Sequence, residues 1–468
     1  MDIEVYESCR YSSHSKCVDA QDQSKGVRMS SLLQSTVIRR VLSNTSWLAS
    51  EKVLTMSVSL VLSIFLARSL GPETWGRLNY LLAIVAMLGP FTSLGLNAII
   101  TREVIKAPEY VDKIIATALT YRLMGGIVGA LICTLVCLQI GSTNEEILLI
   151  SCLLFASLFG AGQVVEFWFQ AEMLNKYVAS MRFSIFLLFA LIKVSAVIMN
   201  VPFWQLIMIF AAELLLTGLG YVYLYVQKNQ RLNFAKIDFH YGWNLLRQSM
   251  WLVLSGLAAV LYLKVDQIML ANMVSNEAVG IYSVAVKLSE VWFFFPAAFA
   301  ASIFPVLLNA RNTDQLRYQR DLQISCDALL GSALIVIITV TVLAPFLVPL
   351  LFGDQYIDSA SVLTIHIWGS VFVFMRALAS KWIISESLLP YSLWSHGLGA
   401  VINIALNLVM IPMFGIWGAA WATVISYFFS GYLCFWFFAK TKPMARVMTR
   451  SILFPFNWHK SFRTLSKR

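Results

Sequence analysis

Ionisable side chains inside long apolar stretches are the residues of this sequence whose types could do chemistry. A charge at the centre of a bilayer costs roughly 2.5–3.5 kcal/mol, so such residues normally line a hydrated cavity or pair with each other. Cations there are candidates for binding an anionic substrate, and acids for ion coupling or for balancing the charge of the cavity. The candidate substrate-binding cations are Lys52, Lys193, Lys264, Lys287 and Arg376, and the candidate acids are Glu213, Asp266 and Glu290.

Structural roles compete with this interpretation at some positions. Lys287 and Glu290 are three residues apart, a spacing that lets two side chains pair on one helix. Lys264 and Asp266 lie near one end of their apolar stretch, from which a side chain can reach the membrane surface. A cavity is favoured at the deeper positions, which lie in four different stretches and are held by Lys52, Lys193, Glu213 and Arg376.

Motifs for catalysis are absent from the sequence. It contains no GxSxG, no Walker A sequence and no HExxH, and its five histidines are far apart. None of its seven cysteines forms a CxxC pair, so neither a disulfide framework nor a zinc site is indicated. We expect no enzymatic activity, no cofactor and no metal site.

The composition is that of a membrane protein. Hydrophobic residues make up 59% of the 468 residues, charged residues only 13%, and the mean hydropathy is +0.72. The apolar stretches reach about 20 residues, which suits transmembrane helices rather than the strands of a barrel. The net charge of +10 resides between these stretches and not on one basic face, so nucleic acid is not an expected partner.

Apolar stretches separated by polar segments predict an all-α membrane protein with about twelve transmembrane helices. The predicted spans are 47–67, 78–100, 114–139, 147–170, 178–200, 204–226, 249–271, 281–305, 326–351, 361–383, 392–411 and 416–438. The longest charged connector between spans divides them six and six. The expected parts are a flexible cytoplasmic N-terminal tail (1–40), an N-lobe (41–226), a cytoplasmic linker (227–248), a C-lobe (249–440) and a basic cytoplasmic C-terminal tail (441–468).

The two halves repeat one layout. A shift of 204 residues places Trp47 on Trp251 and Gly76 on Gly280, and it aligns an apolar helix, a polar corner ending in Glu-x-x-Gly and a second apolar helix in each half. Such self-similarity is the signature of an internal repeat. Because each half has an even number of spans, the two lobes are expected to be related by a pseudo-twofold axis along the membrane normal.

The distribution of basic residues predicts the orientation in the membrane. Among the odd-numbered connections between spans, only the first contains Lys or Arg, namely Arg68 and Arg77. The tails, the central linker and the other even-numbered connections contain basic residues or, at Lys381, follow one closely. Basic loops favour the cytoplasmic side. Both termini are therefore expected to be cytoplasmic.

Several segments resemble one family. The segments are LARSLGPETWGRLNY (66–80), LYLKVDQIMLANMVSNEAVGIYSVAVKL (261–288), LFGDQYIDSASVL (351–363) and NIALNLVMIPMFGIWGAAWAT (403–423). They are similar to Wzx-type O-antigen flippases, in the polysaccharide-transporter branch of the multidrug/oligosaccharidyl-lipid/polysaccharide exporter superfamily.

This resemblance implies a function and a setting. It implies two six-helix lobes around a cationic central cavity that opens alternately to either side of a bacterial inner membrane. The implied substrate is an undecaprenyl-diphosphate-linked oligosaccharide, which moves from the cytoplasmic to the periplasmic leaflet among membrane lipids. A polysaccharide polymerase and chain-length proteins are the implied protein partners. The resemblance also places Asp266 in an Asp-containing stretch of the family.

Other functions fit the same pattern of spans. An ion-coupled exporter of drugs or small metabolites would use Glu213, Asp266 or Glu290 to carry protons or Na⁺. A membrane glycosyltransferase would need a catalytic carboxylate or base in a large external loop. The predicted external loops are short, which argues against the glycosyltransferase and leaves the exporter as the alternative.

Overall fold

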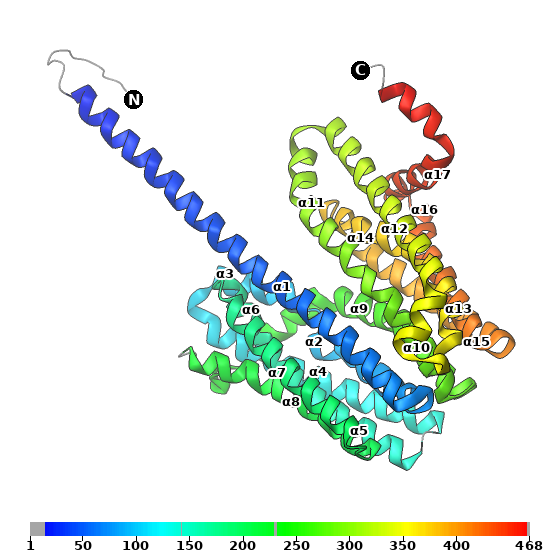
Figure 1. The fold of residues 1–468 in the computed structure, drawn as a ribbon. Helices are drawn as coiled ribbons and strands as arrows, with labels where there is room; N and C mark the ends of the chain where they lie inside the picture. Colours follow the sequence, from blue (N-terminus) through cyan, green and yellow to red (C-terminus); the bar gives the residue numbers. More distant parts are fainter. Residues whose placement is uncertain (1–14, 142, 229–231, 466–468) are drawn as a thin grey trace.

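The computed structural model describes residues 15–141, 143–228 and 232–465, and in these ranges the regular elements are all helices (Figure 1). The N-lobe contains α1 (Ser15–Ala86), α2 (Gly89–Ser93), α3 (Asn97–Lys106), α4 (Val111–Ile140), α5 (Asn144–Leu158), α6 (Glu166–Ala171), α7 (Asn175–Ile198) and α8 (Phe203–Gln227). The C-lobe contains α9 (Phe239–Met273), α10 (Asn276–Glu290), α11 (Phe294–Thr313), α12 (Gln315–Phe352), α13 (Ile357–His366), α14 (Ser370–Ser385), α15 (Leu389–Phe428) and α16 (Cys434–Phe437), and α17 (Lys442–Leu465) follows it. Short 3₁₀ segments include η2 (Phe159–Val165) and η5 (Asp354–Tyr356).

Two glycine corners account for the number of spans. Ten helical stretches in the described residues are long and apolar enough to cross a membrane. The stretches Ser50–Ser93 and Leu389–Phe437 are too long for one crossing, and each is bent at a glycine with non-helical backbone, Gly71 (φ 77°) or Gly415 (φ 56°). Glycine adopts positive φ without steric cost. Each of these stretches therefore supplies two spans, which confirms the predicted twelve.

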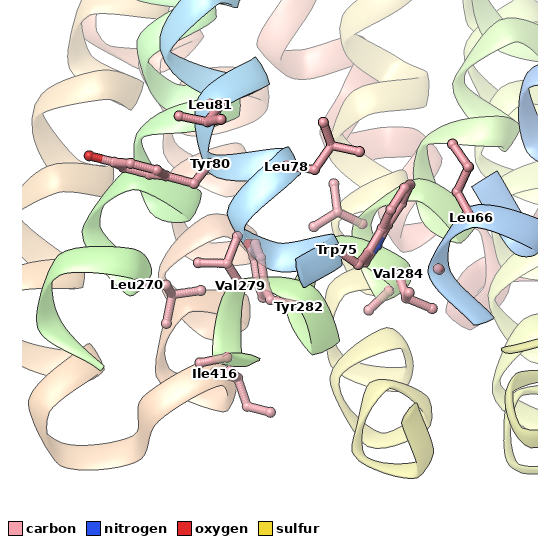
Figure 2. Close-up of a cluster of buried hydrophobic side chains, with 14 of the residues drawn as sticks. Leu66, Trp75, Leu78, Tyr80, Leu81, Leu270, Val279, Tyr282, Val284 and Ile416 are labelled. Atoms are coloured by element: carbon pink, nitrogen blue, oxygen red, sulfur yellow. The ribbon is translucent and has the colours of Figure 1, made fainter. Parts of the chain in front are cut away.

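The two lobes share one hydrophobic core at only one end. That core, near the bends at Gly71 and Gly415, unites residues of α1, α9, α10 and α15, including Leu66, Trp75, Leu270, Tyr282 and Ile416 (Figure 2). We call this side the corner end and the opposite side the terminus end. At the terminus end, the buried residues form two separate clusters, one in the N-lobe joined by the first turns of α9 and one in the C-lobe joined by α17.

A close approach of the lobes joins the two glycines that the repeat makes equivalent. A Cβ added at Gly76 would lie 2.7 Å from the backbone N of Gly280 and nearer still to the carbonyl oxygen of Asn276. A Cβ added at Gly280 would lie 2.7 Å from the carbonyl carbon of Pro72, and Pro72 is the repeat equivalent of Asn276. Reciprocal contacts between equivalent positions are what a twofold axis produces. The pseudo-twofold axis therefore passes between Gly76 and Gly280.

Hydrogen bonds also join the two lobes at the corner end. The Tyr356 hydroxyl donates to the carbonyl oxygen of Ala67 at 2.8 Å, and Arg68 Nη1 donates to the carbonyl oxygen of Leu350 at 3.2 Å. Both bonds run between α1 and the C-lobe. The corner end is thus held by close helix packing and by polar contacts.

The segments expected as tails and linker are largely helical where they are described. The structure describes the predicted N-terminal tail from Ser15, where α1 begins, and residues 1–14 lie outside the described part. In the linker, Asp238 caps α9 by accepting from the Tyr241 amide. Its hydrogen bond with Lys113 lowers the pKa of this carboxyl. The predicted C-terminal tail contains α17, and residues 466–468 are not described.

Candidate functional site

A cavity of about 580 Å³ opens in the N-lobe beside the first helices of the C-lobe. Helices α1, α5, α7, α8 and α10 and the η2 segment contribute its walls. Its volume lies within the roughly 300–1,000 Å³ typical of sites for small ligands. Its charged lining residues are Arg182, Lys193, Glu213 and Lys287, and its polar ones include Ser63, Ser157, Gln163, Thr217 and Tyr221.

Lys193 and Glu213 form an ion pair on one wall of this cavity. Lys193 comes from α7 and Glu213 from α8, and the ammonium group donates to Glu213 Oε2. The Lys193 Nζ also lies 3.7 Å from the centre of the Phe210 ring, where the negative face of the ring attracts a cation. The Lys193 side chain is only 4% exposed. This pair contributes no net charge to the cavity.

Lys287 brings a positive charge from the C-lobe that no carboxylate balances. It extends from α10 to α1, where its Nζ donates to Ser63 Oγ at 2.7 Å and lies 4.6 Å from the Trp75 ring centre. Neither Glu290 nor any other acid of the described part of the chain pairs with it. The lysine was predicted either to pair with Glu290 or to serve a ligand, and the structure excludes the first possibility.

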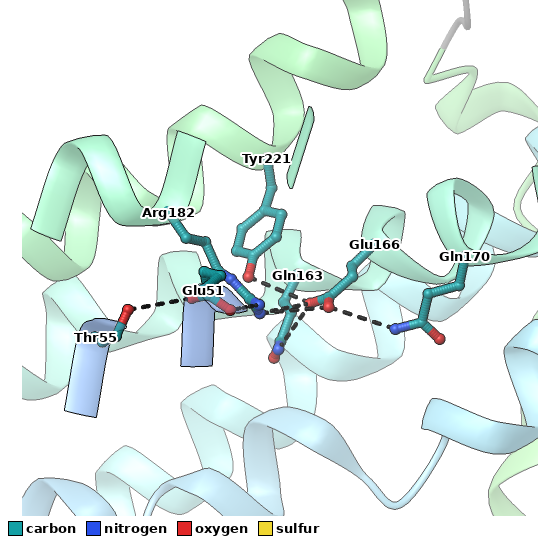
Figure 3. A network of polar contacts seen from close by, with 7 residues as sticks. All are labelled: Glu51, Thr55, Gln163, Glu166, Gln170, Arg182 and Tyr221. Carbon is teal, nitrogen blue, oxygen red and sulfur yellow. Dashed lines mark hydrogen bonds and ion pairs between the residues drawn. The ribbon is translucent and has the colours of Figure 1, made fainter. Parts of the chain in front are cut away.

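Arg182 is a cavity residue that the sequence did not single out. It lies between two carboxylates, with Nη2 at 2.8 Å from Glu51 Oε2 and Nη1 at 3.3 Å from Glu166 Oε1 (Figure 3). Glu166 also accepts from the Tyr221 hydroxyl at 3.3 Å and from Gln163 Nε2 at 3.1 Å. This network fixes α1 to α7, α8 and η2. It also holds the Arg182 guanidinium, Tyr221 and Gln163 in place along the cavity wall.

Lys264 and Glu290 lie outside the lining of this cavity and pair with each other. Lys264 Nζ is 3.7 Å from Glu290 Oε1, and both side chains are partly exposed. Lys264 therefore does not extend away alone to the membrane surface, as one interpretation of its position suggested. The pair connects α9 to the end of α10.

Asp266 lies in a separate buried polar cluster of the C-lobe. It is only 2% exposed and accepts from the Tyr282 hydroxyl at 2.5 Å and from Thr423 Oγ1 at 3.3 Å. Asn403 lies 3.5 Å from Thr423, and Asn407 donates to Asn403 at 3.0 Å. Helices α9, α10 and α15 thus surround one carboxylate with hydroxyl and amide groups. No basic residue pairs with Asp266 in the part of the chain that the structure describes.

Two further predicted cations, Arg376 and Lys52, also lie outside the lining of the N-lobe cavity. Arg376 on α14 is 9% exposed and its Nη2 lies 3.2 Å from His396 Nε2, while Nη1 has no partner among the described residues. Lys52 is exposed, with its Nζ 6.0 Å from the Phe294 ring centre. Its neighbour Glu51 faces Arg182 instead. Of the eight predicted residues, the cavity therefore brings together Lys193, Glu213 and Lys287.

The fold is shared with solved structures of two transporters. The structure resembles that of a lipid II flippase, MurJ, in an inward closed conformation, with a TM-score of 0.64, 13% identity and coverage of 88% of this chain and 92% of that one. It also resembles a multidrug resistance MATE transporter in an inward-facing conformation, with a TM-score of 0.63, 14% identity and coverage of 85% and 96%. These likenesses show a shared two-lobe helical fold.

The sequence shows the family of the chain. The chain belongs to the polysaccharide biosynthesis protein family, whose model matches residues 41–311, and this match confirms the predicted polysaccharide-transporter resemblance. It is 30% identical over 191 residues to the probable flippase AglR of Haloferax volcanii, and 23% identical over 202 residues to an uncharacterized membrane protein of Methanocaldococcus jannaschii. The matched segments span 38% and 39% of those relatives and 40% and 42% of this chain.

Proposed function

We propose that this protein moves a lipid-diphosphate-linked oligosaccharide across a membrane by alternating access. The particular substrate we propose is an undecaprenyl-diphosphate-linked O-antigen repeat unit or a related polysaccharide unit, carried from the cytoplasmic to the periplasmic leaflet of a bacterial inner membrane. The observation that supports it most is the position of Lys287, whose unbalanced charge lies in a cavity that Arg182 and Lys193 also line.

The chemistry of the cargo matches the cavity. A diphosphate and sugar hydroxyls would lose their water in the hydrocarbon, at a cost of several kcal/mol for each unpaired group. Lys287 would bind a phosphate oxygen. The first sugar would form hydrogen bonds with the hydroxyl and amide groups of Ser157, Thr217, Gln163 and Tyr221. The prenyl chain would stay in the lipid.

The packing of the lobes supports rocking. The lobes share a core and backbone contacts at the corner end, whereas their cores at the terminus end are separate. Rigid-body rocking about a fixed contact is a common route of alternating access. With both termini cytoplasmic, the separated end would admit cargo from the cytoplasmic leaflet. The Lys287 contact with Ser63 joins the lobes, so a phosphate at Lys287 would act on both of them.

Asp266 supports a second candidate function, ion-coupled export of small molecules. A buried carboxylate surrounded by Tyr282, Thr423 and Asn403 can exchange a proton or hold a cation. Within the flippase proposal, the same residue would couple an ion to lobe movement.

Deletion of the gene in its host, followed by localisation of the lipid-linked oligosaccharide, tests the proposal. Build-up of the complete repeat unit on the cytoplasmic leaflet, with loss of surface polysaccharide, is the expected result. Unchanged surface polysaccharide with altered drug sensitivity would contradict the flippase and favour the exporter. Complementation with the wild-type gene and with a Lys381→Gln variant, which changes a cation outside the cavity lining, serves as the control.

A further inference from the structure

A second cavity, of about 630 Å³, lies at the terminus end of the C-lobe. It is bounded by the first turns of α12, the connection between α14 and α15, and α17, which Figure 1 shows beside α12 and α16. This cavity is far from the lining of the candidate transport site in sequence and shares no residue with it. Its lining residues combine three cations with an apolar wall.

Helix α17 is held firmly against the C-lobe by one face. Met444, Ala445 and Met448 are fully buried in the C-lobe cluster. On the same side, Ser451 Oγ donates to Asp327 Oδ1 at 2.5 Å, and Gln323 Nε2 donates to Ser451 Oγ at 2.9 Å. These contacts hold α17 in place beside α12. The other face of α17, which contains Arg446 and Arg450, lines the cavity.

The cations of this cavity have no anionic partner among the residues that the structure describes. Lys440, Arg446 and Arg450 are all exposed, and none of them forms an ion pair or hydrogen bond with a residue that the structure describes. Arg446 and Arg450 are four residues apart, which places them on one face of the helix. Three charges converge on one cavity without a counter-ion from the chain.

The single acid that lines the cavity is already neutralised. Glu386 Oε2 lies 2.9 Å from Arg311 Nη2, and Glu386 Oε1 accepts from the Tyr318 hydroxyl at 3.2 Å. Since Arg311 balances Glu386, the charge of Lys440, Arg446 and Arg450 is left in excess. The cavity therefore attracts an anion.

The rest of the lining combines apolar residues with the polar side chains of Gln315, Tyr318, Gln319 and Gln323. Leu322, Trp382, Leu388 and Val447 supply an apolar wall beside the cations. The cavity lies where α12 begins and where α14 and α16 end, at the ends of three stretches that are long and apolar enough to cross a membrane. Lipid headgroups lie at the ends of such stretches. Buried aromatic and aliphatic groups next to a basic cluster suit an amphiphile with an anionic head rather than a small free anion.

We propose that this cavity binds the phosphate headgroup of an anionic phospholipid from the surrounding leaflet. Arg446 and Arg450 contact the phosphate, Lys440 lies at the entrance, and the upper part of an acyl chain lies against Trp382 and Leu388. Basic pockets between helices at a membrane surface bind anionic headgroups in this way. The bound lipid would add to the contacts between α17 and α12 and make the stability of the C-lobe depend on anionic lipid.

Lipid titration of the purified full-length protein tests this assignment. Binding of phosphatidylglycerol and of phosphatidylcholine to the protein in detergent is measured by native mass spectrometry. The wild type is expected to retain phosphatidylglycerol in preference to phosphatidylcholine. The double variant Arg446→Gln/Arg450→Gln is expected to bind phosphatidylglycerol about 30-fold more weakly, because each basic residue near an anionic lipid contributes roughly fivefold.

A double variant of equal charge provides the matched control. Arg317→Gln/Arg320→Gln removes two exposed arginines at the same end of α12 that do not line the cavity, and its lipid affinity is expected to stay within about twofold of wild type, as surface charges at a distance are screened. Equal losses in the two double variants, or no preference of the wild type for phosphatidylglycerol, would overturn the proposal. Displacement of the lipid by millimolar inorganic phosphate would show a site for free anions and would also overturn it.

Arg446 and Arg450 are exposed and unpaired among the described residues. Arg317 and Arg320 are exposed and, in the same part of the chain, pair only with Asp321 at the surface, so both double variants should fold. Their thermal midpoints in lipid-free detergent are expected to equal that of the wild type. If Arg446→Gln/Arg450→Gln lowers this midpoint, the single variant Lys440→Gln replaces it, with an expected loss of about fivefold in phosphatidylglycerol affinity. An unchanged affinity in that variant would then count against the site.

Discussion

Replacing Gly280 by alanine tests how the two lobes are joined at the corner end. The added Cβ would lie 2.7 Å from the carbonyl carbon of Pro72, whereas ordinary van der Waals contact begins near 3.4 Å. Both partners are helix backbone, so no flexible side chain can move aside. The crossing must widen, and overpacking of this kind costs typically about 1–3 kcal/mol. Gly76→Ala meets the carbonyl of Asn276 in the same way, so the two variants should behave alike.

The assay is thermal unfolding of the purified protein in detergent, with Gly331→Ala as the matched control. Gly331 lies inside α12 with nothing within 4 Å of an added Cβ, and alanine in a helix is favoured over glycine by about 1 kcal/mol. We expect Gly331→Ala to match or exceed the wild-type midpoint, and both Gly280→Ala and Gly76→Ala to fall several degrees below it. Midpoints of the two crossing variants at or above that of Gly331→Ala would refute the account of the lobe contact.

Three further changes follow from the contacts of the transport site and the corners. Lys193→Ala leaves the partly buried Glu213 without its partner and should lower stability by at most about 3–5 kcal/mol. Lys193→Met/Glu213→Leu should recover most of the loss, and equal destabilisation of both variants in thermal unfolding would contradict the pairing. Gly71→Ala places a residue with a Cβ at φ 77° and ψ 166°, which should lower stability by about 1–3 kcal/mol. Gly89→Ala should be neutral, because an added Cβ at Gly89 has open space around it. Similar thermal midpoints of the two variants would argue against strain at the Gly71 corner. Asp266→Asn keeps an acceptor for Tyr282 but removes the charge, so transport should lose its dependence on pH or Na⁺ while protein level stays normal; a retained dependence would exclude Asp266 as the coupling acid.

The transmembrane spans and turns could be predicted from the sequence, because each of them depends on a few neighbouring residues. Apolar stretches of bilayer length predicted the spans, and Gly71 and Gly415 fell at predicted turns, where only the chain direction had to change. The repeat shift also identified Gly76 and Gly280 as equivalent. Their direct contact across the pseudo-twofold axis was not predicted, since a contact between halves depends on how the lobes dock.

The site was harder to predict because spacing does not reveal which way a side chain points. Glu51 and Lys52 are neighbours, yet one pairs with Arg182 and the other is exposed. Arg182 itself lies only four residues into its predicted span, where a basic residue is expected to reach the membrane surface. Its role depends on Glu51, which is 131 residues away in the chain, and on Glu166, which is 16 residues away on another helix. Lys287 likewise prefers a contact with Ser63 on the other lobe to its helical neighbour Glu290.

The central claim is that the unbalanced charge of Lys287 binds the diphosphate of the cargo. It is tested most directly by the flipping rate of a prenyl-diphosphate-linked oligosaccharide in proteoliposomes that contain the purified protein. We predict that Lys287→Gln lowers the rate at least tenfold, the effect of about 1.4 kcal/mol, while Lys287→Arg retains most of it and Lys381→Gln is unchanged. A wild-type rate in Lys287→Gln would contradict the claim.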